Sequence, residues 1–245
     1  MLLTPSVRLV GSGWLGSSLT HALDCNVYLV GSADDAVLVD AGCGLGTAAI
    51  LREIDESGIP RSAVRRILVT HSHADHAAGA AALAVELGAE VIASVETARI
   101  LEHADEDAAG LVSARATGLY PPEVRLTPTP VTPIADRVSF SVGDGRMTTI
   151  ATPGHATGHL CFLWENGIRA VFTGDLVFAR GRVAVLATPD TDVALLGTSV
   201  ARVARTHPAA MFAGHGEPVL TEAPLHLEVA VRAFENHTLP PPLIN

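Results

Sequence analysis

Short runs of apolar and β-branched residues recur along the chain, and glycine, proline or aspartate separates most of them. Each short run is typical of a buried strand, whereas the longer amphipathic or alanine-rich stretches predict helices. The expected strands are 26–30, 36–40, 66–69, 89–93, 138–142, 147–151, 160–164, 169–172 and 209–213. The expected helices are 46–57, 77–87, 95–109, 192–207 and 221–234.

The order of these elements predicts the layers of the fold. Strands and helices alternate in the first part of the chain, whereas 138–172 contains only strands and reads as an antiparallel meander. Two sheets packed face to face, with helices on the outside, would bury this much apolar strand. A length of 245 residues, 48% of them hydrophobic, supports a large core, and we expect a single domain over residues 1–245.

Two segments lack a regular pattern. Residues 111–133 contain Gly118 and five prolines, which predicts a long loop. Leu119 and Tyr120 could lie over a ligand there, although a solvated connector explains the segment equally well. The tail 239–245, with three prolines, is expected to be loosely ordered.

Composition excludes several classes of function. The net charge is −10, with sixteen arginines and no lysine, so the basic surface needed to bind nucleic acid is not expected. No apolar run is long enough to span a membrane, and no signal peptide is evident. Three cysteines without a Cys-x-x-Cys pair predict a reducing, cytoplasmic environment, and the sequence leaves a homodimer open. The expected partner is a small-molecule substrate.

The densest chemistry lies in Thr-His-Ser-His-Ala-Asp-His, residues 70–76, between an expected strand and an expected helix. Residues two apart in an extended segment point to the same side, so His71 and His73 can bind one ion together. Asp75 and His76 fall where the helix begins and cannot easily turn back to that ion. The spacing therefore suggests a second metal position beside the first.

Further ligands follow three later strands. His155 lies in a glycine-containing turn, Asp175 directly follows the strand 169–172, and His215 stands between two glycines. Each of these residues comes just past a strand. We therefore expect one edge of the sandwich to hold the site.

This combination of motifs resembles the metallo-β-lactamase superfamily. The resemblance implies an α/β fold, the four-layer αβ/βα sandwich. It implies that His71, His73 and His155 bind one ion, that Asp75, His76 and His215 bind a second, and that Asp175 bridges both. Asp40, at the end of its strand, stands where the family carries a carboxylate that orients a ligand histidine.

The implied chemistry is hydrolysis of a small ester, lactone or thioester by a metal-bridging hydroxide, with two divalent ions, zinc or alternatively iron or manganese. Asp75 would carry the proton to the leaving group. Tyr120, Phe178 and Arg180 are candidate substrate contacts. The alternative is a mononuclear iron persulfide dioxygenase of the same superfamily.

The sequence differs from two known branches of this superfamily, and each difference narrows the class of substrate. The common zinc β-lactamases often have a cysteine where Asp175 stands, which disfavours antibiotic cleavage. Glyoxalase-II enzymes have a basic C-terminal helical region for glutathione, whereas the residues after Pro218 include one arginine and no lysine. We also expect His159 to stabilise its turn and Cys43 to be a small buried side chain.

Overall fold

A computed structural model describes residues 1–186, 188 and 190–244. Its first sheet has seven strands in chain order. They are β1 (Leu2–Thr4), β2 (Val7–Gly11), β3 (Val27–Gly31), β4 (Ala36–Val39), β5 (Val64–Leu68), β6 (Glu90–Ala93) and β7 (Val131–Pro133). The pairs from β1 to β4 are antiparallel and those from β4 to β7 are parallel. Parallel neighbours need crossovers, and helices lie in each of them.

Five helices lie between the strands of the first sheet in the chain. They are α1 (Thr47–Glu56), α2 (Ala74–Ala77), α3 (Ala80–Leu87), α4 (Val95–His103) and α5 (Leu111–Ala116), with the short 3₁₀ turn η1 (Arg61–Ala63) before β5. The side chain of Ser94 caps α4 by accepting from the Thr97 amide.

The second sheet has five strands in the order β12-β11-β10-β9-β8. They are β8 (Ser139–Val142), β9 (Gly145–Ala151), β10 (Leu160–Asn166), β11 (Ile168–Gly174) and β12 (Ala210–Ala213). The first four form the expected antiparallel meander, and β12 pairs parallel with β11. The remaining elements are η2 (Ala179–Gly181), α6 (Val193–Ala204) and α7 (Ala223–Glu235).

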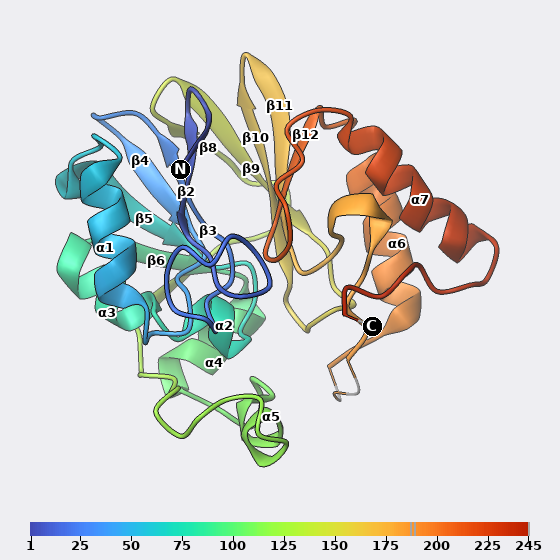
Figure 1. Ribbon diagram of the computed structural model, residues 1–245, viewed down its shortest axis with the longest axis horizontal. Helices are drawn as coiled ribbons and strands as arrows, with labels where there is room; N and C mark the ends of the chain where they lie inside the picture. The colour runs from blue at the N-terminus through green and yellow to red at the C-terminus, as the bar shows by residue number, and fades with distance from the viewer. Residues whose placement is uncertain (187, 189, 245) are drawn as a thin grey trace.

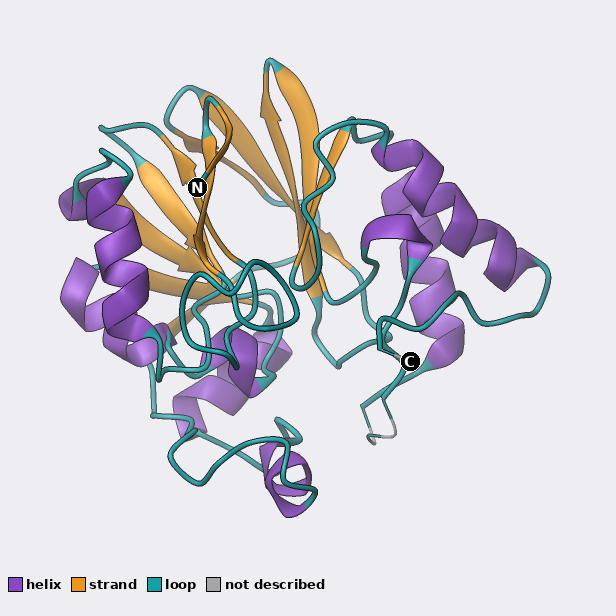
Figure 2. Cartoon of the chain, viewed as in Figure 1, coloured by secondary structure: helices purple, strands orange, loops and turns teal. Residues whose placement is uncertain are grey.

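The two sheets face one another, with helices α1, α3 and α4 outside the first and α6 and α7 outside the second (Figures 1 and 2). Alternate residues of a strand point to different layers. Leu29 and Val171 pack toward the helices, whereas Tyr28 and Phe172 pack between the sheets. Both faces of each sheet are therefore buried, and the predicted four-layer αβ/βα sandwich is confirmed.

The structure corrects the expectations for four segments. Residues 111–133 are not one long loop, because they begin with α5 and end with β7, which extends the first sheet. The helix expected over 77–87 is α3, which begins only at Ala80, and a separate short helix, α2, ends at Ala77. The helix expected over 95–109 ends at His103, because Ala104 adopts a left-handed conformation with φ 49°. The N-terminal strands β1 and β2 were not expected at all.

The C-terminal tail also differs from its expected loose order. The amide of Val183 donates to Pro241 O, and the amide of Leu243 donates to Val183 O. These two bonds hold the tail beside the segment that follows η2. Within the part of the chain that the structure describes, no helix is long and apolar enough to cross a membrane.

Strand direction brings distant loops to one edge. Strands β9 and β11 both run opposite to β10, and β12 runs parallel to β11, so the carboxyl ends of β9, β11 and β12 share an edge. The loop after β5 meets this edge from the first sheet (Figure 1). The chain thereby gathers the predicted ligands from four separate segments.

Candidate metal centre

The segment after β5 carries four of the predicted ligands. His73 has an extended backbone, with φ −60° and ψ 144°, and is the N-terminal cap residue of α2. His71 thus belongs to the extended segment, while Asp75 and His76 lie in the first turn of the helix. This change of backbone direction separates the two pairs, as the spacing predicts.

Three imidazole nitrogens converge on one point. His73 Nδ1 lies 3.0 Å from His71 Nε2 and 3.1 Å from His155 Nε2. The rings meet edge to face and not as a stack. This first ligand group combines the segment after β5 with the turn between β9 and β10.

A second ligand group lies beside the first. Asp75 Oδ2 is 3.0 Å from His215 Nε2 and 3.6 Å from His76 Nε2. The three residues have ligand atoms close enough to hold one ion, and so do those of the first group. His215 follows β12, so this group also joins the two halves of the chain.

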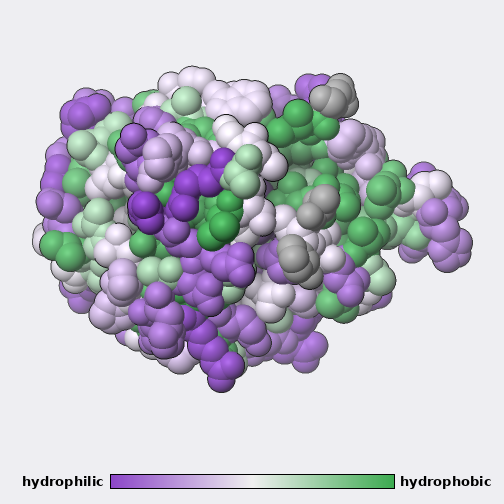
Figure 3. Space-filling view, turned by 90° about the horizontal axis from the view of Figure 1, so that it is seen from below, coloured by the Kyte–Doolittle hydropathy of each residue, from purple (hydrophilic) through white to green (hydrophobic). Residues whose placement is uncertain are grey.

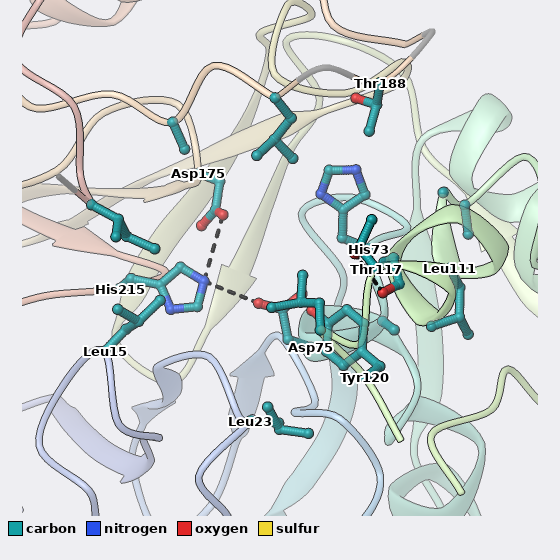
Figure 4. A pocket seen from close by; sticks show the side chains of 18 of the residues that line it. Leu15, Leu23, His73, Asp75, Leu111, Thr117, Tyr120, Asp175, Thr188 and His215 are labelled. Carbon is teal, nitrogen blue, oxygen red and sulfur yellow. Dashed lines mark hydrogen bonds and ion pairs between the residues drawn. The ribbon is translucent and has the colours of Figure 1, made fainter. Parts of the chain in front are cut away.

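Asp175 lies between the two groups. Its Oδ1 is 3.2 Å from His76 Nε2, and its Oδ2 is 3.6 Å from His155 Nε2 and 3.5 Å from His215 Nε2. Figure 4 shows the contacts of His215 with both Asp175 and Asp75. A single carboxylate therefore faces histidines of both groups.

Gly214 is required by this packing. A Cβ atom at position 214 would lie 2.4 Å from Asp175 Oδ1 and 2.5 Å from His76 Cε1. Any side chain there would displace a residue of the centre. The glycine before His215 thus leaves room for the carboxylate between the two groups.

Three of the five histidines are hydrogen-bonded through their second ring nitrogen, which is how ligand imidazoles are usually oriented. A fourth, His73, has its second nitrogen near a carboxylate without a hydrogen bond to it. The partners differ in chemistry, being a hydroxyl, a backbone carbonyl and two carboxylates. They are Thr70 Oγ1 for His71 (3.0 Å), Asp190 Oδ2 for His73 (3.5 Å), Asp40 Oδ2 for His76 (2.8 Å) and Ala184 O for His155 (3.1 Å). Each contact leaves the other nitrogen directed into the centre.

Electrostatics favour cation binding. Burial, reinforced by neighbouring histidines, lowers the pKa of His71 well below its ordinary value, and burial lowers the pKa of His155 to about 4. Burial would raise the pKa of Asp175, but His215 and His76 lower it well below its ordinary range. The neutral imidazoles of His71 and His155 and the ionised carboxylate of Asp175 are the protonation states that metal binding requires. Burial would lower the pKa of His76 and His215, but the negative charges around them raise it, so a cation bound by the second group must displace protons from these two imidazoles.

Two buried atoms of the ligand groups support the binding of a cation directly. Among the described residues, His76 Nε2 and Asp175 Oδ1 are buried side-chain atoms without a hydrogen-bond partner. Buried polar groups in folded proteins nearly always have a partner, so such orphaned atoms need an explanation. A cation between the residues of the second group and Asp175 would satisfy both.

A cavity of about 340 Å³ reaches this centre. His73, Asp75, His155, Asp175 and His215 line its polar end. The wall that contains Tyr120 comes from the segment after α5, and the hydroxyl of Tyr120 donates to Asp75 Oδ1 at 2.8 Å. Tyr120 thus lies where a substrate contact was predicted, and it also holds a predicted ligand.

The other two candidate substrate contacts lie elsewhere. Phe178 is buried behind His215, with ring centroids 6.1 Å apart, and does not line the cavity. Arg180 is exposed and points to Glu217 at 3.3 Å. The turn η2 carries both residues away from the opening, so their predicted role in substrate contact does not agree with this placement.

Several contacts that position the ligands were missed by the sequence analysis. His159 does stabilise its turn through Thr152 Oγ1 at 2.8 Å, but its Nε2 also accepts from the amide of Asp175. Asp190 is remote from every motif, and no sequence signal indicates it. Thr70, the first residue of the 70–76 motif, donates to Asp40, which a search for strand-end hydroxyls could have found. Cys43 is buried, as expected.

Residues 22–215 match the metallo-beta-lactamase superfamily, and the matched range contains every predicted ligand. The chain belongs to the metallo-β-lactamase superfamily. Membership implies binding of divalent metal, and the two ligand groups are the candidate positions for it.

Relatives of this superfamily member carry names of several hydrolases. The chain is 25% identical over 197 residues to thioesterase pkgB of Emericella nidulans, covering 80% of this chain and 46% of that protein. It is 29% identical over 178 residues to a hydroxyacylglutathione hydrolase of Rhizobium etli, covering 70% of this chain and 58% of the relative. The chain spans about half the length of the curated relatives it matches.

Solved structures agree on the fold. A metallo-beta-lactamase of Cronobacter sakazakii with an HARLDQ motif, in its S60 mutant form, superposes with a TM-score of 0.73 at 21% identity, covering 97% of this chain and 93% of that one. A metallo-beta-lactamase family protein of Thermus thermophilus gives a TM-score of 0.71 at 24% identity, covering 96% and 81%. At these identities the likeness concerns the fold alone.

Proposed function

We propose that this protein is a dinuclear, divalent-metal hydrolase of small ester, lactone or thioester substrates. The observation that carries the proposal is the place of Asp175, whose two oxygens face histidines of both ligand groups. His71, His73 and His155 would hold one ion, Asp75, His76 and His215 the other, and Asp175 both. Zinc suits imidazole and carboxylate ligands well, although iron and manganese use the same set.

When bound, divalent ions supply Lewis-acid chemistry, lowering the pKa of water toward neutrality and polarising a carbonyl oxygen. The residues of the chain position the reactants and move the proton. Asp75 lines the cavity and directs Oδ2 into the centre, while Tyr120 restrains Oδ1. Asp75 is therefore the residue proposed to take a proton at Oδ2 and pass it to the leaving group.

The relatives' names favour a thioester among the three substrate classes. One relative is named a thioesterase, another an atrochrysone carboxyl ACP thioesterase, and a hydroxyacylglutathione hydrolase cleaves an acylated thiol by name. Among the described residues that line the cavity there is no lysine or arginine. That lining offers no cation to the two carboxylates of a carrier such as glutathione, and it agrees with a small, largely neutral substrate.

The test is an activity panel on zinc-loaded protein. We expect hydrolysis of at least one member of a set of small esters, lactones and thioesters, and no oxygen uptake on a persulfide. The Asp75→Asn variant should keep much of its metal but lose most of its turnover. Oxygen uptake by an iron-loaded protein that hydrolyses none of the panel would replace the proposal with the dioxygenase alternative. A fully active Asp75→Asn variant would remove the proposed role of Asp75.

A further inference from the structure

Large apolar side chains gather around the cavity that leads to the metal centre. Trp14, Leu119, Leu186 and Ile244 are each at least 40% exposed, and all four line this one cavity. Exposed apolar residues are ordinary when scattered, but a group of them around one opening indicates a binding surface. The space-filling view from below shows hydrophobic residues near the middle and right of this face, with hydrophilic residues along its left and lower rim (Figure 3).

The walls come from four parts of the chain, one of which is the segment after η2 that contains Ala184 and Leu186. Leu15 and Leu23 belong to the loop between β2 and β3, and Figure 4 shows them on one side of Asp75. Leu111 and Thr117, from α5 and the turn after it, lie on the other side. The tail adds Leu243 and Ile244, which the backbone bonds to Val183 hold in place.

The cavity is therefore polar at one end and apolar along its length. Besides Asp75 and Asp175, the cavity is lined by the carboxylate of Asp24, whose oxygens already accept hydrogen bonds from the protein. The donors are the Cys43 amide at 2.9 Å, Thr20 Oγ1 at 2.6 Å and the His21 amide at 3.0 Å. Asp24 thus offers little to a ligand. A volume of about 340 Å³ lies at the lower end of the range for small-molecule sites.

We propose that this cavity binds the acyl part of the substrate, and that the protein selects thioesters with an apolar aliphatic acyl chain of several carbons. The carbonyl would lie at the polar end beside Asp75 and Asp175, and the chain would lie along Leu23, Leu111 and Leu119. The inference rests on the proposed hydrolase function. It assigns the specificity to the acyl side, because the cavity offers a neutral, apolar wall and no described cation.

Chain length is the direct test. With zinc-loaded protein and S-acyl N-acetylcysteamine thioesters from acetyl to octanoyl, we expect kcat/KM to rise up to about fourfold for each added methylene, which corresponds to about 0.8 kcal/mol. The rise should stop when the cavity is filled. A series that is flat, or that falls from acetyl onward, would overturn the inference while leaving the hydrolase function in place.

Variants with and without a change in the cavity wall test whether the preference for long acyl chains arises in this cavity. Leu119→Asn is expected to lower the octanoyl-to-acetyl ratio of kcat/KM at least tenfold. Leu225→Asn is the control, because Leu225 lies on α7, does not line the cavity, and is 55% exposed against 56% for Leu119. Ile244→Asn, a substitution in the exposed tail, is a second test should Leu119→Asn fold poorly. Equal ratios in Leu119→Asn, Ile244→Asn and the control would overturn the inference.

Binding without turnover separates this inference from the proposed function. The test ligands are ketones in which a methylene replaces the thioester sulfur. Trp14 lines the cavity whereas Trp164 is fully buried, so a ligand-dependent change in emission that Trp14→Phe abolishes reports on this site. The octanoyl ketone should bind at least tenfold more tightly than the butanoyl ketone. If no ester, lactone or thioester is hydrolysed but this difference holds, the hydrolase function fails and the apolar acyl site stands. Equal affinities of the two ketones would overturn the acyl site.

Discussion

The hydroxyl of Tyr120 donates a 2.8 Å hydrogen bond to Oδ1 of Asp75, whose Oδ2 lies 3.0 Å from His215 Nε2. Burial, together with the negative charge of Asp75, raises the pKa of Tyr120, so the phenol stays neutral and remains a donor. A residue of the cavity wall thus orients a carboxylate of the candidate metal centre. The segment that forms the wall and the centre itself are connected through this bond.

Replacing Tyr120 with phenylalanine should weaken the second metal position. Residues that orient metal ligands typically change metal affinity 10- to 100-fold when they are mutated. We expect Tyr120→Phe to lose about tenfold in affinity for one of the two zinc ions, measured by competition with a chromophoric chelator. Thr117→Val is the control, because it removes from the same wall a hydroxyl that donates to Ala114 O and, among the described residues, to no other acceptor. Equal affinities in Tyr120→Phe and the wild type would contradict the orienting role.

Substitutions of Asp40 test whether its carboxylate orients the ligand histidine His76. Asparagine keeps the shape of the side chain and removes its charge. Its carboxylate accepts from the Thr70 amide at 2.8 Å and from Thr70 Oγ1, and it contacts His76 Nδ1 at 2.8 Å. Its φ of 64° is left-handed, a conformation that asparagine tolerates better than alanine. Asp40→Asn should therefore fold and lose 10- to 100-fold in zinc affinity.

Asp40→Ala should do more damage. It leaves buried donors without an acceptor and adds backbone strain, so we expect it to be about 2 to 4 kcal/mol less stable than Asp40→Asn. Urea unfolding of both variants measures this difference. Equal stabilities would mean that the hydrogen bonds of Asp40 contribute little to the fold.

Gly214 tests whether the space between the two ligand groups is needed. Gly214→Ala places a Cβ against Asp175 and His76, so zinc affinity should fall at least tenfold. Gly167→Ala is the comparison, because its φ is 71° and nothing lies within 4 Å of the added Cβ. That variant should lose only about 1 kcal/mol of stability and keep its metal. A Gly214→Ala protein with unchanged zinc affinity would show that the close packing is not required.

Glu106 makes the stability of the Tyr120 segment depend on pH. Its side chain accepts from Arg115 at 2.6 Å and from the Leu126 amide at 3.2 Å, on either side of Tyr120. Burial would raise the pKa of Glu106, but these two bonds outweigh it and the pKa is lowered. A lowered carboxyl pKa stabilises the fold above the ordinary pKa, and this stabilisation is lost as the pH falls through the lowered value.

Glu106→Gln should therefore be roughly 1 to 2 kcal/mol less stable than the wild type at pH 7. The difference should shrink as the pH falls below about 4, where the wild-type carboxyl is protonated too. Urea midpoints of both proteins at pH 7, 5 and 3.5 check this trend. A difference that is constant over this range would contradict an ionic role for Glu106.

The candidate metal centre could be predicted because its residues follow strand ends. Hydrophobic runs fix where each strand stops, so His71, His155, Asp175 and His215 are visible as polar side chains just beyond buried segments. The four layers follow from the same runs. When both faces of each sheet must be buried, only a few layered arrangements of these strands and helices are possible.

The cavity wall was not predictable in the same way. The helix α5 was missed because its six residues leave only a weak periodic signal. The prolines from Pro121 to Pro133 made the whole segment resemble a loop. The pairing of β7 with β6 depends on tertiary contact, as does the contact of Asp190 with His73. Phe178 and Arg180 looked like substrate contacts because they follow Asp175, but η2 turns the chain away from the opening.

The number of bound ions tests the central proposal most directly. Elemental analysis of zinc-loaded wild-type protein, after removal of free metal by gel filtration, should give two zinc ions per chain. His155→Ala removes one histidine of the first ligand group and should give about one. One ion in the wild type, or two in the variant, would contradict a centre in which two separate groups share Asp175.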